Sequence, residues 1–158
     1  MAERLTDEEQ QERSAWFRHH WEHGVAYNRH NGIRVDRWDA DGVEFYLPYR
    51  DELSAHVGIF HGGAVGSLID TAATGAIIAG HDFNYGSRLT TISMSLQYLS
   101  AARGEDLICR ARCTRRGRRI NFAEARVEGA VSGALVATGQ VAANISGERP
   151  GAPWATNA

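Results

Sequence analysis

The sequence of 158 residues lacks two features that mark common classes of protein, a long hydrophobic run and an imbalance of charge. No run approaches the about 20 apolar residues that a membrane-spanning helix needs. The formal net charge is −2 at pH 7, so overall charge does not favour nucleic acid or an anionic membrane surface as a partner. The N-terminal segment MAERLTDEEQQERSAW is too charged and polar for a signal peptide. We therefore expect a soluble cytoplasmic protein with no nucleic-acid or membrane partner.

Cysteine is also scarce, because the sequence has only two, Cys109 and Cys113. In an extended strand these two would lie about 13 Å apart on one face, too far for a disulfide. We expect both to be small core residues. His19 and His23 stand one helical turn apart, but no third ligand lies at a recognisable spacing, so we predict no metal site.

Residues 1–30 are expected to form a helical extension ahead of the main domain. Thr6 and Glu9 have the spacing of a capping box, and helix-forming residues continue from there toward Tyr27. Three aromatic residues lie along this helix: Trp16, Phe17 and Trp21. They would bury too much apolar area to be left in water, so we expect the helix to dock over the main domain or over a neighbouring subunit.

Residues 31–146 are expected to form the main domain, and most of it is predicted to be strand. Two extended runs between Ile33 and Tyr49 flank Asp41-Gly42, a dipeptide that favours a hairpin turn.

Four further strands are predicted after residue 87, joined by glycine-containing turns into an antiparallel meander that ends near Asn144. In the first of them apolar residues alternate with small polar residues, which predicts a half-buried strand. The apolar positions are Ile92, Met94, Leu96 and Tyr98, and the polar positions are Thr91, Ser93, Ser95 and Gln97. Residues 147–158 are expected to be a flexible C-terminal tail.

One long helix is expected over residues 62–79, beginning inside the stretch HVGIFHGGAVGSLIDTAATGA (56–76). It is the only element apolar enough to fill the concave face of such a sheet. Its apolar positions are Val65, Leu68, Ile69, Ala72, Ala76 and Ile77. The prediction is an α+β fold, an antiparallel sheet wrapped around one long central helix.

Asp70 is the one carboxylate among the apolar residues of this helix. A buried carboxylate is costly unless it is paired or has a chemical task. Its neighbours three and four positions away are all small and would leave space beside it: Gly66, Ser67, Ala73 and Thr74. Asp70 is therefore a candidate catalytic acid, and the alternative is a structural acid hydrogen-bonded inside a subunit contact.

A resemblance to a known family rests on His61-Gly62-Gly63 followed by Asp70, and on the segments TTISMSLQYLSAA and RCTRRGRR. Over about residues 33–144 the chain resembles the hotdog-fold acyl-CoA thioesterases of the phenylacetate-pathway (PaaI-like) type. The resemblance implies a hotdog fold and hydrolysis of an acyl-CoA to a free carboxylic acid and coenzyme A, without a metal or a bound cofactor.

The resemblance also implies roles for individual residues. The backbone N–H of Gly62 would polarise the thioester carbonyl from the helix N-terminus, where unpaired N–H groups and a partial positive charge meet the developing oxyanion. Asp70 would activate water or attack the carbonyl, and the hydroxyl of Thr91 would help to hold the water. His61 is expected to be a positioning residue at the substrate site, beside Gly63.

One position departs from the family pattern. The family commonly has an asparagine six residues before the histidine of the triplet, and here that residue is Ala55. The adjacent His56 is a candidate substitute in contact with substrate. The departure keeps a second function open, a non-catalytic hotdog protein that binds acyl-CoA.

A basic cluster follows in the turn between two predicted strands: Arg115, Arg116, Arg118 and Arg119. We predict that it binds the phosphate groups of coenzyme A, for which the guanidinium fork is well shaped. The alternative is a solvated hairpin.

The spacing of the candidate site predicts an oligomer. Gly62 and Asp70 are eight residues apart, or about 12 Å along a helix, so one thioester carbon cannot contact both. The two groups of one site should therefore come from two chains whose central helices run antiparallel, an approach that the glycines and alanines of the helix would allow. We expect a homodimer, or a homotetramer built as a dimer of dimers, with composite active sites.

Overall fold

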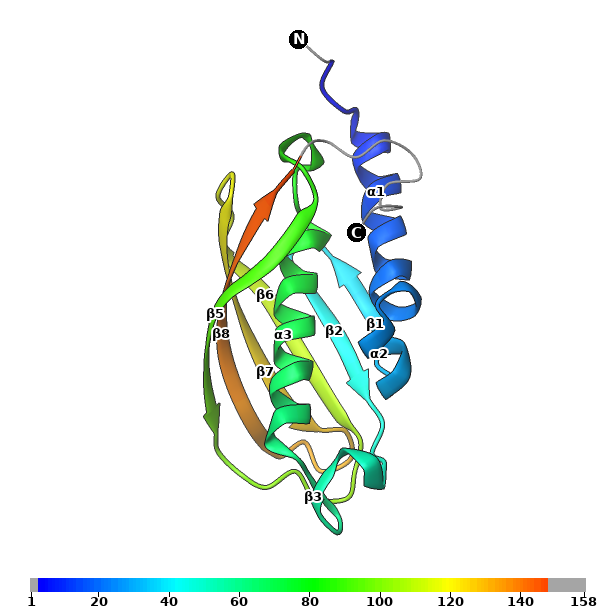
Figure 1. Cartoon of the computed structure of the whole chain (residues 1–158), viewed down its shortest axis with the longest axis vertical. Helices are drawn as coiled ribbons and strands as arrows, with labels where there is room; N and C mark the ends of the chain where they lie inside the picture. Colours follow the sequence, from blue (N-terminus) through cyan, green and yellow to red (C-terminus); the bar gives the residue numbers. More distant parts are fainter. Residues whose placement is uncertain (1–2, 148–158) are drawn as a thin grey trace.

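The computed structural model describes residues 3–147 and shows a six-stranded sheet wrapped around one long helix, α3 (Gly62–Ala79) (Figure 1). The strands lie in the order β1-β2-β6-β7-β8-β5, and every neighbouring pair is antiparallel. Their bounds are β1 (Arg34–Asp39), β2 (Gly42–Leu47), β5 (Arg88–Tyr98), β6 (Leu107–Arg115), β7 (Ile120–Gly129) and β8 (Leu135–Ser146). The predicted α+β fold is confirmed. The hairpin turn between β1 and β2 lies at Ala40-Asp41, one residue before the predicted Asp41-Gly42, because Gly42 already pairs with Asp39 in the sheet.

The segment just before α3 is more structured than its sequence pattern indicates. A 3-10 turn (Asp51–Leu53) leads into a small two-stranded sheet of β3 (Ser54–His56) and β4 (Ile59–Phe60). Gly58 closes this hairpin with φ +77°, a left-handed conformation that favours glycine. The residues ahead of α3 therefore form a short hairpin that leads into its first turn.

The glycines of α3 make room for the sheet of the same chain. A Cβ atom on Gly66 would lie 3.1 Å from Leu96 Cδ1, and one on Gly75 would lie 2.9 Å from the Phe45 ring. These two glycines therefore allow the sheet and the helix of one chain to approach closely. Packing, rather than helix propensity, holds α3 in place.

β5 forms one edge of the sheet, and its apolar side chains are less buried than the alternation predicts. Ile92 is 55% exposed, Met94 44% and Tyr98 52%. The strand lies beyond β8 and pairs with no other strand of the described chain. The single chain thus leaves both an open strand edge and an apolar strip without cover.

The N-terminal extension begins with the predicted capping box, because Thr6 and Glu9 each accept the other's backbone N–H. It is not one helix: α1 (Asp7–His19) continues through a π-helical turn (His20–Gly24), and Val25 separates this from α2 (Ala26–Asn31).

The extension docks on its own chain. Phe17 is buried and its ring stacks on Phe83 at 5.2 Å, while the Trp21 indole N–H donates a 3.0 Å hydrogen bond to the Thr71 carbonyl of α3. The expected docking over the main domain is confirmed.

Two further expectations concern the core. Cys109 is fully buried and Cys113 half-buried, and both are free thiols, as predicted. α3 is long and apolar enough to cross a membrane by composition, but 72% of it is buried, as in the core helix of a soluble α+β domain.

The predicted C-terminal tail lies outside the described residues except for Gly147.

Candidate functional site

Asp70 lies in the middle of α3 on the side that faces the β5 edge. Its Oδ1 accepts a 2.8 Å hydrogen bond from the hydroxyl of Thr91. Burial raises the pKa of the Asp70 carboxyl, and the hydrogen bond from Thr91 opposes part of that shift. A half-buried carboxylate that is held by a single hydroxyl has lone pairs left for water or substrate.

A β-bulge brings Thr91 to Asp70. The pairing of β5 with β8 runs from Thr91↔Ala143 to Ser93↔Ala142, so Ile92 is an extra residue. Strict alternation would place Thr91 on the face opposite to Met94 and Leu96. The bulge reverses this, and Thr91 joins them on the face toward α3.

At the start of α3, His61 is the N-cap residue. Its Nδ1 accepts the N–H of Gly63 at 2.8 Å, and its carbonyl accepts the N–H of Ala64 at 2.9 Å. The Gly62 N–H has no hydrogen-bond partner among the described residues. Of the two glycines in the triplet, Gly62 alone therefore presents a free donor at the positive end of the helix dipole.

Tyr98 is a member of this site that our sequence analysis did not select. Its hydroxyl donates a 2.7 Å hydrogen bond to the Gly62 carbonyl, and its ring lies 3.6 Å from where a Gly62 Cβ would be. The contact ties the end of β5 to the first turn of α3. The available signal was the alternation that places Tyr98 on the same strand face as Leu96.

The structure does not bring all the predicted residues together within one chain. Asp70 and Thr91 meet, but Gly62 lies eight residues from Asp70, or about 12 Å along the helix axis. His56 and Ala55 are exposed on β3, and no described contact joins His56 to Asp70 or Gly62.

The basic cluster divides into residues with different surroundings. The Arg116 guanidinium donates to the carbonyls of Ala76 at 3.0 Å, Ala40 at 2.9 Å and Ile77. The last carbonyls of a helix lack intrahelical partners, and a cation there also complements the helix dipole. Arg116 therefore caps α3, and these contacts already engage the guanidinium group that we predicted to bind phosphate.

All four arginines of the cluster are exposed, and the other three make no hydrogen bond of this kind to α3 in the described structure. Arg118 lies over the ring of Tyr85, with its Cζ 5.0 Å from the ring centroid. Arg118 and Arg119 line a cavity beside that ring, whereas Arg115 lines a groove with Phe122. All lie near the C-terminal end of α3, away from Gly62.

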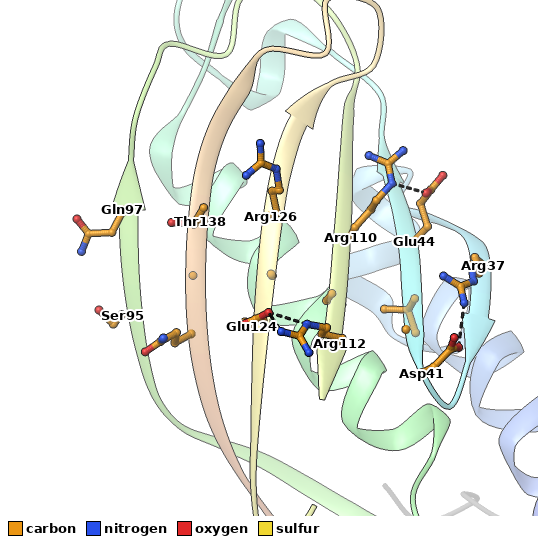
Figure 2. Close-up of a pocket in the computed structure, with 16 residues that line it drawn as sticks. Arg37, Asp41, Glu44, Ser95, Gln97, Arg110, Arg112, Glu124, Arg126 and Thr138 are labelled. Atoms are coloured by element: carbon orange, nitrogen blue, oxygen red, sulfur yellow. Dashed lines mark hydrogen bonds and ion pairs between the residues drawn. The ribbon is translucent and has the colours of Figure 1, made fainter. Parts of the chain in front are cut away.

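A groove of about 690 Å³ lies on the outer face of the sheet, opposite α3 (Figure 2). Its arginines are paired: Arg110 with Glu44 at 2.8 Å, and Arg112 with Glu124 at 2.6 Å. Neither Asp70 nor Thr91 lines it. We therefore place the candidate site at α3 and β5. In the described part of the chain no cluster of three metal-ligating side chains occurs.

An antiparallel sheet wrapped around one long central helix is the hotdog fold. A solved thioesterase family protein from Silicibacter pomeroyi has this fold, with a TM-score of 0.78 and 22% identity over 84% of this chain and 98% of its own. Residues 57–133 match the family described as Thioesterase superfamily. Slightly less than half of the chain therefore matches a thioesterase superfamily domain.

Two curated relatives agree with this family. A provisionally assigned esterase from Halobacterium salinarum is 32% identical over 99 residues, which cover 61% of this chain and 65% of the relative. Human acyl-coenzyme A thioesterase 13 is 26% identical over 95 residues, which cover 60% of this chain and 66% of the relative. The chain thus spans slightly less than two thirds of either relative.

The raised pKa of Asp70 has a consequence for stability. The folded state binds this proton more tightly than the unfolded state does, so ionisation of Asp70 lowers the free energy of unfolding at pH values above its raised pKa. Below the pKa of the unfolded state the carboxyl is protonated in both states, and the effect is absent. We expect Asp70→Asn to raise Tm at pH 7 by a few degrees, with the gain disappearing as the pH falls below 4. Thermal melts at both pH values test this. Thr91→Val is the control and should not stabilise. An Asn variant that melts below the parent at pH 7 would contradict the assignment.

Proposed function

We propose that this protein is a PaaI-like acyl-CoA thioesterase that hydrolyses an acyl-CoA to a free carboxylic acid and coenzyme A. The observation that carries the proposal is the Asp70 carboxylate, held by Thr91 in a half-buried position beside an open sheet edge. The match to the thioesterase superfamily and similarity to an acyl-coenzyme A thioesterase support the substrate class.

The residues divide the chemistry between them. A thioester carbonyl bound at the start of α3 would accept the free N–H of Gly62, which stabilises the negative charge that develops on its oxygen. Asp70 takes a proton from water as that water attacks the carbonyl carbon, or it attacks the carbon itself and forms an anhydride that water later hydrolyses to the free acid and Asp70. In both routes the C–S bond breaks, and the thiolate of coenzyme A leaves and is protonated.

The raised pKa of Asp70 fits either role, because a more basic carboxylate is a better base and nucleophile. The carboxylate must be ionised to act. Activity should therefore fall as the pH drops through a pKa higher than that of an ordinary aspartate.

One complete site needs two chains. The β5 edge is unpaired in the chain and exposes Ile92 and Met94, so a second copy can extend the sheet there and cover the apolar strip. Two α3 helices placed antiparallel across a two-fold axis would bring Gly62 of one chain beside Asp70 of the other. We propose a homodimer with two composite sites, and pairing of dimers into a homotetramer.

A panel of acyl-CoA esters, assayed for release of the coenzyme A thiol, tests the activity. We expect release from at least one aromatic or aliphatic ester. Because Ala55 stands in place of the family asparagine, the alternative is a protein that binds acyl-CoA without turnover. If calorimetry shows that an ester binds but no ester in the panel releases thiol, the alternative is supported and the proposed thioesterase activity is overturned.

A further inference from the structure

The first turn of α3 contains two consecutive glycines, Gly62 and Gly63, which leave its backbone poorly restrained. Glycine adopts backbone conformations that other residues cannot, and each glycine weakens a helix by about 1 kcal/mol relative to alanine. An N–H that stabilises an oxyanion must point in one fixed direction before the reaction begins, because its effect depends on preorganisation. The free N–H of Gly62 therefore needs support from outside the helix backbone.

The peptide group between Gly62 and Gly63 is hydrogen-bonded on both sides. Its carbonyl accepts the Tyr98 hydroxyl at 2.7 Å, and its N–H, which belongs to Gly63, donates to His61 Nδ1 at 2.8 Å. The C=O and N–H of a planar trans peptide point in opposite directions, so two such bonds fix its rotation. The rotation of this peptide sets the ψ angle of Gly62, and the direction of the Gly62 N–H is restrained with it.

Two glycines let the Tyr98 side chain approach the helix backbone. A Cβ on Gly62 would lie 3.6 Å from the ring, whereas one on Gly66 would lie 3.2 Å from the Tyr98 hydroxyl, closer than an ordinary contact. A side chain at position 66 would therefore displace the hydroxyl that reaches Gly62. His61 belongs to the turn that it caps, so it is Tyr98 that ties the Gly62–Gly63 peptide to the sheet.

The strand that carries Tyr98 is held where it ends. The N–H groups of Leu99 and Ser100 both donate to the Val136 carbonyl, at 2.8 Å and 3.2 Å. The Ser100 hydroxyl donates to the Leu135 carbonyl at 2.7 Å. A residue can position another group only if its own backbone is fixed, and these bonds fix the backbone just after Tyr98.

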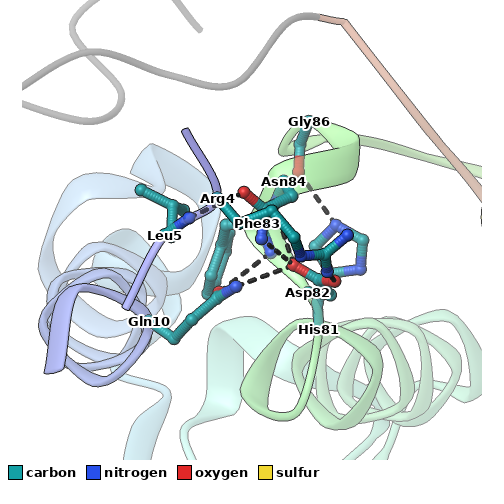
Figure 3. Close-up of polar contacts among 8 residues, drawn as sticks. All are labelled: Arg4, Leu5, Gln10, His81, Asp82, Phe83, Asn84 and Gly86. Atoms are coloured by element: carbon teal, nitrogen blue, oxygen red, sulfur yellow. Dashed lines mark hydrogen bonds and ion pairs between the residues drawn. The ribbon is translucent and has the colours of Figure 1, made fainter. Parts of the chain in front are cut away.

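β5 is also anchored where it begins, by the loop that joins it to α3 (Figure 3). Arg4 and Gln10 of the N-terminal segment donate to Asp82 of this loop, at 2.6 Å and 2.7 Å. Arg4 also lies over the ring of Tyr85 in the same loop, at 5.9 Å. Both ends of the strand are therefore held by contacts other than its pairing with β8, and the strand cannot slide along α3.

We propose that Tyr98 is a positioning residue for thioester hydrolysis. Its hydroxyl holds the Gly62–Gly63 peptide so that the Gly62 N–H points at the oxygen of the thioester carbonyl. The inference rests on the proposed function for the role of that N–H. Tyr98 acts through the backbone and exchanges no proton with the substrate or with water.

Steady-state kinetics tests this role. Tyr98→Phe keeps the ring and removes the hydroxyl, so kcat for an acyl-CoA should fall about tenfold while KM stays within about twofold of the parent. Tyr27→Phe is the matched control. Tyr27 is also half-exposed and donates at 2.9 Å to α3, but to the side-chain hydroxyl of Ser67 rather than to a peptide group.

The control variant should keep more than half of the parental kcat. An equal loss of kcat in Tyr27→Phe would show that the effect is not specific to the Gly62–Gly63 peptide and would overturn the proposal. A rise in KM at constant kcat for Tyr98→Phe would show that Tyr98 contacts the substrate instead, and would also overturn it.

A double-mutant cycle identifies the group through which Tyr98 acts. In a Gly62→Pro background the N–H is absent, so Tyr98→Phe should cause no further loss of kcat. In a Thr91→Val background the N–H is present, and the two losses should multiply. Losses that multiply in the Gly62→Pro background would overturn the role of Tyr98 as a support for this N–H.

NMR relaxation of the protein labelled with 15N-glycine tests the contact without any turnover. The amide order parameters of Gly62 and Gly63 should be near about 0.85 in the parent and fall below about 0.6 in Tyr98→Phe. Gly75, which lies in the same helix against the Phe45 ring, should not change and so reports that the variant is folded.

The two measurements together distinguish this inference from the proposed function. If no ester is hydrolysed but the order parameters fall, Tyr98 does fix the turn and the proposed thioesterase activity is overturned. If the parent hydrolyses acyl-CoA and Tyr98→Phe changes neither kcat nor the order parameters, the enzyme stands and the role of Tyr98 is overturned. A fall in kcat with unchanged order parameters would likewise overturn positioning.

Discussion

Mixed dimers of an Asp70→Ala subunit and a Gly62→Pro subunit are expected to hydrolyse acyl-CoA, although neither parent homodimer does. The acid and the free N–H lie about 12 Å apart along one helix, whereas groups acting on one carbonyl must lie within about 3.5 Å of the reacting atoms. If each site takes its acid from one chain and its N–H from the other, a mixed dimer has one site with both groups intact.

Gly62→Pro is suited to this test because it removes the N–H at little structural cost. Gly62 is the first residue of α3, a position where proline is favoured, and His61 before it has the extended ψ of 134° that proline requires. A Cβ at Gly62 would lie 3.6 Å from the Tyr98 ring, which is an ordinary contact. Gly62→Ala, which keeps the N–H, is the matched control and should remain active.

The expected change is large. Each variant alone should lose about 10³-fold in kcat, because removing an oxyanion donor or a catalytic base costs about 10²–10⁴. In an equal mixture half of the dimers are mixed and each has one of two sites, so about a quarter of parental activity should return. Thiol release is measured after co-refolding, and mixed dimers are identified by a tag. Mixed dimers that form but stay inactive, or a fully active monomer, would overturn the composite site.

Arg116→Ala should lower stability more than loss of any other arginine of the basic cluster. The guanidinium donates to three carbonyls, two in the last turn of α3 and one at Ala40 in the β1–β2 turn. Its loss leaves the carbonyls of Ala76 and Ile77 without this partner and disconnects the hairpin from the helix. We expect a loss of about 2 kcal/mol in the free energy of unfolding, or about 4–8 °C in Tm.

Arg115→Ala is the control for this prediction, because Arg115 is exposed and makes no ion pair in the described structure. It should melt within about 1 °C of the parent. Urea titration of both variants separates the effect from a change in net charge, which is the same in each. Equal stability of the two variants would show that the carbonyl contacts of Arg116 contribute nothing and would return it to the phosphate-binding candidates.

The elements of this fold that were predicted correctly depend on short-range signals. The capping box at Thr6, the hairpin that joins β1 to β2 and the apolar helix over residues 62–79 each depend on residues close together in the sequence. The π-helical turn at His20 was missed because its sequence continues a good helical pattern.

The candidate site was predicted less completely, because its contacts cross between elements. Thr91 was selected by resemblance, although strict alternation along the strand would place it on the face away from α3. The bulge at Ile92 in β5 turns Thr91 toward α3 and so allows its contact with Asp70. Tyr98 was not selected, since its hydrogen bond to Gly62 joins residues 36 positions apart. Arg116 looked equivalent to its neighbours in sequence and differs from them only by what it contacts.

The sequence by itself determined the α+β architecture, the central helix and the identity of its acid, because hydrophobic periodicity and turn chemistry act through local geometry. The tertiary structure alone decided which arginines are free for a ligand and which one caps α3, and which face Thr91 occupies. It also decided that the loop at Tyr85 meets the N-terminal segment. These depend on strand register and on contacts between segments far apart in the chain, which no local pattern specifies.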